Sequence, residues 1–351
     1  MKLQPSPGVI CTDPTIAPDF VRVLRTLGHG RAARAQLVEA DMPDGRTVTC
    51  VEKVFAPGLL TRTLYRLSFQ SPFAYQSNRD AILACFYRRR VASAVLAGSD
   101  IDASIASPLY VRFDPTNRAW VLAAQWIDGR GIKPADVDST RIRRWVSGVE
   151  TQPEQSEIDE LVETMGRLEQ MLADCGLVGS GWQVAPRALV STANLLRSDE
   201  RYTIIDLESG IPAVLVPRYL LAGLRSAALP PFDDLDAHKL QTWIEDNERL
   251  LTFRIGPAAV DQLRVDSERL IEHSSRWKDS ELAVFRRPWR LLTKRGTQAY
   301  QQECFRRWQQ DGVVDDETAQ TLNQRPIKSR MIWYSGLLPS SLGRFCSRLI
   351  G

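Results

Sequence analysis

The stretch FVRVLRTLGHGRAARAQLVEADMPDGRTVTCVEKVF, residues 20–55, decides the fold class. Three short runs rich in valine, leucine and threonine follow one another along it, which is typical of β-strands. The turn pair Asp44-Gly45 separates the second run from the third, as in a tight hairpin. The stretch therefore predicts three consecutive strands that form an antiparallel meander.

Downstream of this meander the chain first shows one helix pattern and then two strand patterns. The segment 80–96 predicts a helix that Asn78 or Asp80 would cap. Two further strands are expected at 107–114 and 118–127, with turn residues between them. These five strands and one helix would complete a β-rich first part.

Beyond the last of these strands the pattern becomes mostly helical. Ser156 and Asp159 form a variant of the capping box at the start of an amphipathic segment, which Gly176 ends. Two short strands are expected at 188–198 and 201–209, on either side of a turn. Amphipathic helices are expected at about 218–228, 235–252, 257–276 and 297–311. Strands first and helices later is the order of an α+β fold.

Length and composition limit the function classes. The chain has 351 residues, of which 44% are hydrophobic, and its net charge of +3 argues against a general nucleic-acid binder. Its six cysteines are scattered, as expected of reduced thiols in the cytoplasm, and its three histidines lie far apart. No secretory signal and no apolar run of membrane-spanning length is found. We therefore expect a cytoplasmic protein, peripheral to a membrane at most.

The same patterns divide the chain into four expected parts. Residues 1–18, with four prolines, would be an extended leader. Residues 19–127 would form a small β-rich lobe, and 128–280 a larger helical lobe. Residues 281–351 would form a basic amphipathic helical extension, because they hold twelve Lys/Arg against six Asp/Glu.

The first candidate site lies in the meander. Gly28 and Gly30 end its first strand and small Ala33 follows; glycines at such a turn let backbone N–H groups approach a polyphosphate, although an ordinary glycine turn fits equally well. Lys53 stands in the apolar third strand, on the face opposite Glu52. A buried lysine needs an anionic partner, and a solvated strand lysine is the alternative. The glycine loop and the lysine together indicate phosphate binding more strongly than either feature does alone.

The second candidate site lies about 140 residues downstream, in the expected strand pair. Asn194 and Asp206 stand on either side of its turn, so pairing of the strands would bring their side chains together at one end. Two oxygen ligands beside phosphates suit Mg²⁺, and Glu208 could supply a further oxygen. The alternative is that Asn194 and Asp206 only cap turns.

The order of these features resembles the protein-kinase-like superfamily. The resemblance covers about residues 20–280 and depends on the combined order of glycine loop, strand lysine, helix, two strands, long helix, Asn and strand-borne Asp. It implies a bilobal fold that binds ATP with Mg²⁺. Gly28, Gly30 and Ala33 look like the phosphate-covering loop, and Lys53 looks like the residue that grips the α- and β-phosphates.

The resemblance also implies roles for residues after the β-rich part. Gln125, Trp126 and Ile127 look like the hinge that pairs with adenine, and Asn194 and Asp206 look like the metal ligands. The segment IDLE at 205–208 is similar to the IDWE and IDFE segments of aminoglycoside and choline kinases. On this interpretation Lys53 faces Asp206 across a single cleft.

Several positions depart from the kinase pattern. Leu189 stands where a working kinase places the Asp that orients the substrate hydroxyl, and no acid occurs from 176 to 197. Arg187 and Glu208 are the candidates for a catalytic role. The helix expected at 80–96 lacks the Glu that would pair with Lys53, so Asp80, Glu208 or a phosphate is expected to take that place.

Two functions therefore stay open at the level of sequence. The first is a kinase-like phosphotransferase that lacks the expected catalytic Asp and acts on a non-peptide or membrane-associated substrate. The second is a pseudokinase that works as an interaction scaffold, with or without bound nucleotide. Loss of the base predicts slow turnover or none, because general base catalysis contributes about 10²–10⁴-fold.

The basic extension suggests a partner of its own. Residues 285–351 interleave arginine and lysine with tryptophan, phenylalanine and leucine, which suits an anionic membrane surface or a protein partner. The alternative is that its helices pack on the large lobe and expose their arginines to solvent. The apolar finish at Gly351 also suggests that the chain is truncated there.

Overall fold

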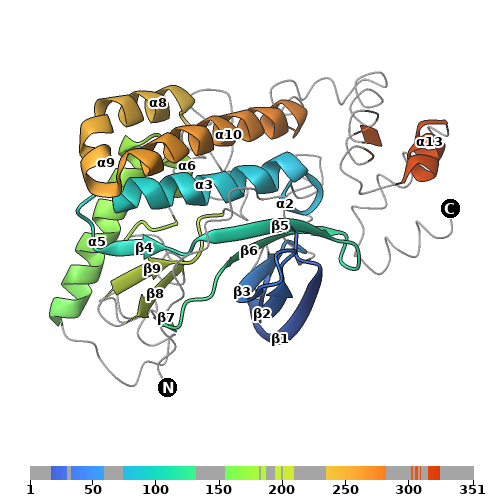
Figure 1. Cartoon of the computed structure of the whole chain (residues 1–351), viewed down its shortest axis with the longest axis horizontal. Helices are drawn as coiled ribbons and strands as arrows, with labels where there is room; N and C mark the ends of the chain where they lie inside the picture. The colour runs from blue at the N-terminus through green and yellow to red at the C-terminus, as the bar shows by residue number, and fades with distance from the viewer. Residues whose placement is uncertain are drawn as a thin grey trace.

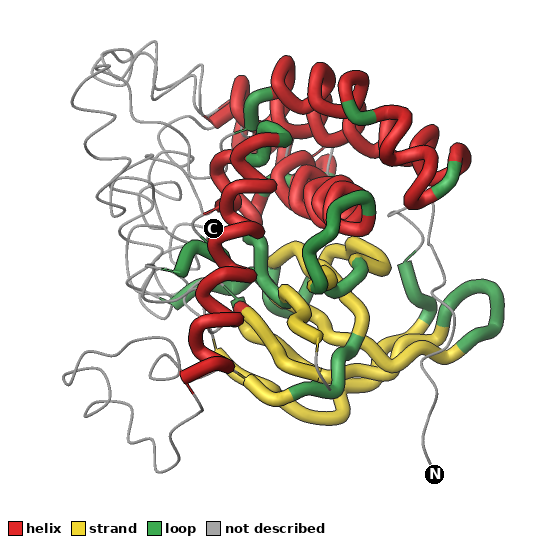
Figure 2. Tube along the Cα trace, turned by 90° about the vertical axis from the view of Figure 1, so that its left-hand side faces the viewer, coloured by secondary structure: helices red, strands yellow, loops and turns green. Residues whose placement is uncertain are grey.

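A computed structural model gives the architecture of the chain (Figure 1). It describes residues 17–29, 33–58, 74–131, 155–181, 183–186, 194–198, 201–208, 235–281 and 315–324, with four further residues between 302 and 309. These residues form a mixed α+β fold, as the sequence predicts. Strands gather on one side and helices lie above them (Figure 2). The division into four parts stays a prediction.

The predicted meander forms one end of a five-stranded sheet. Its strand order is β1-β2-β3-β6-β5, and all neighbours in it are antiparallel. The turn at Asp44-Gly45 joins β2 to β3, and Gly45 has a φ of 81°, a value that glycine adopts without strain. The strands are β1 (Phe20–His29), β2 (Arg34–Asp41), β3 (Thr47–Val54), β5 (Pro108–Asp114) and β6 (Ala119–Gln125).

A second sheet of four short strands carries the other half of the predicted site. Its order is β4-β9-β8-β7, and β8 pairs with β9 in the antiparallel manner expected from the sequence. β4 adds to β9 in parallel, and this strand and β7 were not predicted, because strands of two or three residues leave no periodic pattern. The strands are β4 (Ala103–Ile105), β7 (Arg130–Gly131), β8 (Leu195–Ser198) and β9 (Arg201–Ile204).

The helices largely follow the predicted pattern. The Asn78 side chain caps the first long helix by accepting the Ala81 N–H, and Asp315 caps the last one through Thr318. Gly176, with a φ of 84°, follows the end of the long helix that the sequence placed before it. The helices are α2 (Ala74–Ser77), α3 (Arg79–Ala97), α5 (Gln155–Asp174), α6 (Val178–Gly181), α8 (Ala237–Asp246), α9 (Glu248–Ile255), α10 (Pro257–Glu281) and α13 (Asp316–Gln324).

One helix prediction is wrong and two are not tested. The single helix expected at 235–252 is two helices, because Asn247 interrupts it and its side-chain amide donates to the Trp243 carbonyl. Such local side-chain bonds compete with the helical ladder. The helix expected at 218–228 lies outside the described residues, and of 297–311 only isolated residues are described.

Helix α3 lies at the centre of the hydrophobic core, between α10 and the sheets (Figure 1). Two polar contacts fasten it to α10. Arg90 Nε donates to Asp266 at 2.7 Å, and His273 Nδ1 lies 2.8 Å from Asp80. Asp80 is therefore not the partner of Lys53, one of the alternatives that the sequence left open, because its carboxylate faces α10. The contacts fix the orientation of α3 against the core.

No described helix is both long enough and apolar enough to cross a membrane. This agrees with the absence of a long apolar run in the sequence.

The buried ion pair between α3 and α10 gives a first prediction. Asp266→Ala leaves Arg90 without its carboxylate where both side chains are less than 10% exposed, so we expect a loss of about 3 kcal/mol in unfolding free energy. Asp261→Ala is the matched control, because Asp261 lies on the same helix with a 75% exposed side chain. Urea denaturation measures both, and equal losses would contradict a structural role for the buried pair.

Candidate functional site

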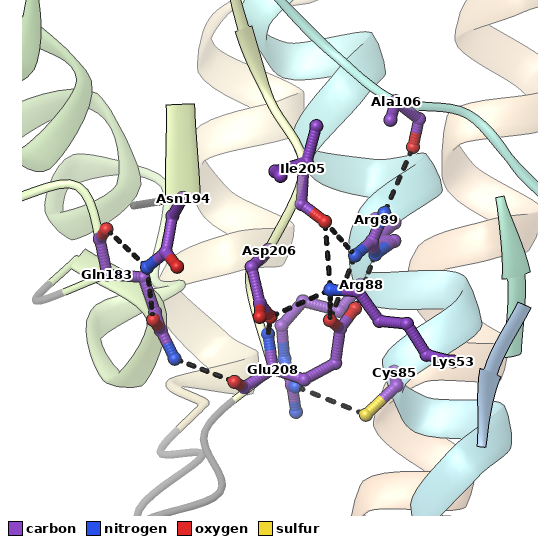
Figure 3. Close-up of polar contacts among 10 residues, drawn as sticks. All are labelled: Lys53, Cys85, Arg88, Arg89, Ala106, Gln183, Asn194, Ile205, Asp206 and Glu208. Atoms are coloured by element: carbon purple, nitrogen blue, oxygen red, sulfur yellow. Dashed lines mark hydrogen bonds and ion pairs between the residues drawn. The ribbon is translucent and has the colours of Figure 1, made fainter. Parts of the chain in front are cut away.

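Lys53 projects from β3 toward the segment that follows β9. Its Nζ donates to the Ile205 carbonyl at 2.9 Å and lies 3.1 Å from Asp206 Oδ1 and 3.0 Å from Glu208 Oε2 (Figure 3). The structure thus brings the lysine and the aspartate into direct contact across about 150 residues of sequence. The side chain of Lys53 is only 12% exposed, so the alternative of a solvated strand lysine is wrong.

Strand alternation puts the neighbour of Lys53 on the other face of the sheet, as predicted. Glu52 is fully buried there and accepts two hydrogen bonds from the Arg112 guanidinium, at 2.6 Å each. Tyr110 donates to the same carboxylate at 2.9 Å. This second ion pair balances its own charge, so Glu52 is not available to Lys53.

The β8–β9 hairpin sets the spacing of the two expected metal ligands. Leu195 pairs with Ile204, and the next pair along is joined by a bond from the Ile205 N–H to the Asn194 carbonyl at 2.8 Å. Asn194 therefore lies opposite Ile205, the residue before Asp206. The predicted strand pairing is confirmed, and the meeting of the two side chains at a metal stays a prediction. Asn194 is 9% exposed, whereas the Asp206 side chain keeps 36% of its surface exposed.

Arg89 completes the site, and sequence reasoning missed it. This fully buried residue of α3 binds both carboxylate oxygens of Glu208, and it donates to the carbonyls of Ile205 at 2.7 Å and Ala106 at 3.3 Å (Figure 3). The available signal was the run of three arginines, 88–90, within an otherwise apolar helical segment, since an arginine that becomes buried requires a carboxylate. We call Lys53, Arg89, Asp206 and Glu208 the charge cluster.

The two carboxyl groups of the charge cluster differ in their electrostatics. Burial alone would raise the pKa of Glu208, but Arg89 and Lys53 outweigh it and hold that pKa well below its usual range. Burial raises the pKa of Asp206 to about 6, against the pull of Lys53, and the neighbouring Glu208 charge adds to the rise. Glu208 is thus a fixed anion, while the ionised form of Asp206 is disfavoured.

These electrostatics bear on the catalytic candidates. A general base must accept a proton near neutral pH, and a carboxylate held by two cations with its side chain 3% exposed is poorly suited to that. Glu208 instead positions Lys53 and Arg89. Arg187, the other candidate, and Leu189 lie outside the described residues.

The expected phosphate loop is described only at its edges. Gly28 lies within β1, beside an irregularity in the pairing with β2, and an added Cβ would meet no atom of the described residues within 4 Å. The described part of the chain therefore leaves space at this glycine. Ala33 packs against the core, and Gly30 lies outside the described residues.

The expected adenine-binding segment follows β6, the strand paired with β3. Gln125 ends β6 opposite Cys50, and its backbone N–H already donates to the Ser107 carbonyl at 2.8 Å. Ile127 and Trp126 are half-buried, and the Arg25 guanidinium lies 5.7 Å from the Trp126 ring. The segment is thus near the same sheet as Lys53, and its role toward adenine stays a prediction.

The donor set available to a metal is small. Within the described part of the chain, no three His, Cys, Asp or Glu side chains gather as a metal site. Mg²⁺ typically uses one or two carboxylates and takes its other ligands from phosphates and water. The oxygens of Asp206 and Asn194 fit that requirement, whereas they would not suffice for zinc.

No protein-family model and no curated protein matches this chain.

The raised pKa of Asp206 gives a second prediction. The folded chain holds this proton more tightly than the unfolded chain, so wild-type stability falls as pH rises from about 4 to about 6. Asp206→Asn has no carboxyl group to ionise at this position, so its stability does not fall for this reason over that pH range. At pH 8 we expect its thermal midpoint to rise by about 3 °C, after discounting for the partly exposed carboxylate, and at pH 4 we expect no difference.

The same change from acid to amide at Glu208, two residues away, should lower the stability of the chain, whereas Asp206→Asn should raise it. Glu208→Gln removes the carboxylate that binds the buried Arg89, so we expect about 3–5 kcal/mol of lost stability at pH 8. That contribution is present above the usual glutamate pKa and is lost as pH falls through the lowered one. Calorimetry from pH 4 to 8 compares the variants, and destabilisation by Asp206→Asn would contradict this assignment.

Proposed function

We propose that this chain binds ATP together with Mg²⁺ at the charge cluster, in a bilobal, kinase-like arrangement of its β-rich and helical parts. The observation that carries the proposal is the 3.1 Å contact between Lys53 Nζ and Asp206 Oδ1. A cation for phosphate and a carboxylate for metal are the two groups that a nucleotide–metal complex requires side by side.

The charges of the cluster suit a site in which Asp206 can exchange its contact with Lys53 for a contact with a metal ion. Glu208 keeps both cations paired whatever happens at Asp206, because it binds Arg89 and Lys53 together. Asp206 is the more exposed of the two carboxylates and the one whose ionised form is disfavoured. A divalent cation would stabilise its ionised form, and phosphate oxygens would replace it beside Lys53.

The proposed metal would be held by Asp206 and Asn194. When bound, Mg²⁺ supplies charge neutralisation for the phosphates. The protein's own part is to present a lysine to the phosphates and two oxygens to the ion. Loops near Gly28 and Gly30 would cover the phosphates, and the segment at Gln125 and Ile127 would contact the base.

The proposal also includes the rate of phosphoryl transfer, which is expected to be slow or zero. Positioning and charge neutralisation supply most of the acceleration in phosphoryl transfer, so a missing base lowers the rate without abolishing it. The substrate proposed from the sequence is a non-peptide or membrane-associated molecule. Attachment of 285–351 to an anionic membrane or a protein stays a proposal from the sequence.

One observation favours a second function, a pseudokinase that acts as a scaffold without nucleotide. Lys53 and Asp206 neutralise each other, and Lys53 has three acceptors within 3.1 Å. A site whose groups are satisfied by one another can be purely structural. Ligand binding separates the two functions.

Thermal unfolding with ATP, with and without Mg²⁺, is the test. At a nucleotide concentration about 100 times the dissociation constant, binding adds about 2.7 kcal/mol of stability. We expect Mg²⁺-dependent stabilisation of the wild type and its loss in Asp206→Asn. The control is Asp102→Asn, since Asp102 is 77% exposed in an ion pair with Arg201, away from the charge cluster.

Three outcomes are informative. Stabilisation of the wild type and the control alone supports the proposal. No effect of ATP and Mg²⁺ on the wild type would overturn it and leave the scaffold function. Equal stabilisation of all three proteins would put the nucleotide at another site.

A further inference from the structure

Gln183 is a buried side chain to which neither the sequence patterns nor the charge cluster gives a role. It lies in the turn after α6, is 3% exposed, and uses every polar group of its side chain. Its Nε2 donates to the backbone carbonyl of Glu208 at 2.7 Å. Its Oε1 accepts from Asn194 Nδ2 at 2.7 Å, and its backbone carbonyl accepts from the same nitrogen at 3.0 Å.

These bonds have a fixed direction. A backbone carbonyl can only accept, so the group of Gln183 that faces Glu208 must be its NH₂. Its remaining side-chain group is then an oxygen, which requires a donor from Asn194. The backbone carbonyl of Gln183 requires a donor from Asn194 as well. The Glu208 carbonyl thus fixes the orientation of the Gln183 amide, and Gln183 in turn fixes the NH₂ group of Asn194 as the donor.

The consequence is the orientation of the Asn194 amide. Both hydrogens of its NH₂ group point at Gln183, and its Oδ1 therefore points away from it. In Figure 3 that oxygen lies on the side of Asp206. Rotation of the amide by 180° would set its oxygen against two carbonyl oxygens, so the arrangement excludes it.

We propose that Gln183 is a positioning residue for a divalent cation, which keeps the amide oxygen of Asn194, and not its nitrogen, beside Asp206. The same side chain ties the segment after β9 to the turn after α6 through the Glu208 carbonyl. This inference rests on the proposed function, because it assigns Asn194 Oδ1 to the metal. Groups that orient a metal ligand typically change metal affinity by 10–100-fold when they are removed.

The test measures the Mg²⁺ concentration that half-saturates the ATP-dependent thermal shift. Gln183→Met keeps the size of the side chain and removes its polar groups. We expect it to raise the half-saturating Mg²⁺ concentration about 10-fold. The matched control is Gln36→Met, because Gln36 is also buried, at 6% exposure, and donates to Glu52 on the other face of the sheet. We expect the control to change that concentration less than 2-fold.

A double-mutant cycle separates positioning from general destabilisation. In an Asn194→Ala background the oxygen that Gln183 orients is absent, so Gln183→Met should raise the half-saturating concentration less than 2-fold further. Additive losses would overturn the proposal, as would equal effects of Gln183→Met and Gln36→Met. A wild type without any Mg²⁺-dependent response would overturn the proposed function, and this inference with it.

A second measurement needs no variant and covers the case in which Gln183→Met does not fold. In wild-type chain labelled with ¹⁵N-asparagine, both side-chain amide protons of Asn194 should exchange slowly with solvent, because both are donated to Gln183. The side-chain resonance should move on addition of Mg²⁺ and ATP. Fast exchange of either proton would overturn the proposed orientation.

Discussion

The rest of the structure depends on one carboxylate that binds two cations. Glu208 follows β9, and it holds Lys53 of β3 and Arg89 of α3 where water has little access. Three elements from distant parts of the sequence are thus fixed to one group. Since removal of one member leaves an unpaired buried charge, their relative positions are tightly constrained. The second, separate ion pair of Glu52 and Arg112 keeps the opposite sheet face from competing for these cations.

The charge cluster differs from what the resemblance to kinase-like proteins implied for Lys53. The helix beside the strand lysine contributes an arginine and not a glutamate, and the carboxylate comes from the segment after β9. Desolvation and the neighbouring Glu208 charge raise the pKa of Asp206, against the pull of Lys53. Such an unfavourable carboxylate costs stability, which is common at functional sites. In the proposed function, Glu208 has the structural part and Asp206 the ligand-binding part.

The sequence predicts the features that repeat or alternate. The meander and the β8–β9 hairpin follow from strand alternation and turn residues, which are local. The contact of Lys53 with Asp206 joins distant parts of the chain, and only the resemblance implied it. Arg89 was missed because α3 is buried nearly all round, so its apolar pattern does not show which residue faces the site. Gln183 was missed because its partners are the backbone carbonyl of Glu208 and the amide of Asn194, and these leave no trace in residue spacing. The break at Asn247 depends on one local side-chain bond.

The most direct test of the account is a crystal structure with a non-hydrolysable ATP analogue and Mn²⁺, located by its anomalous scattering. The account predicts a manganese peak bound by Asp206 and Asn194, phosphate oxygens at Lys53, and an unchanged pair of Arg89 and Glu208. An analogue bound elsewhere, or a saturated crystal in which Lys53 still contacts Asp206 and no metal lies beside it, would contradict the account.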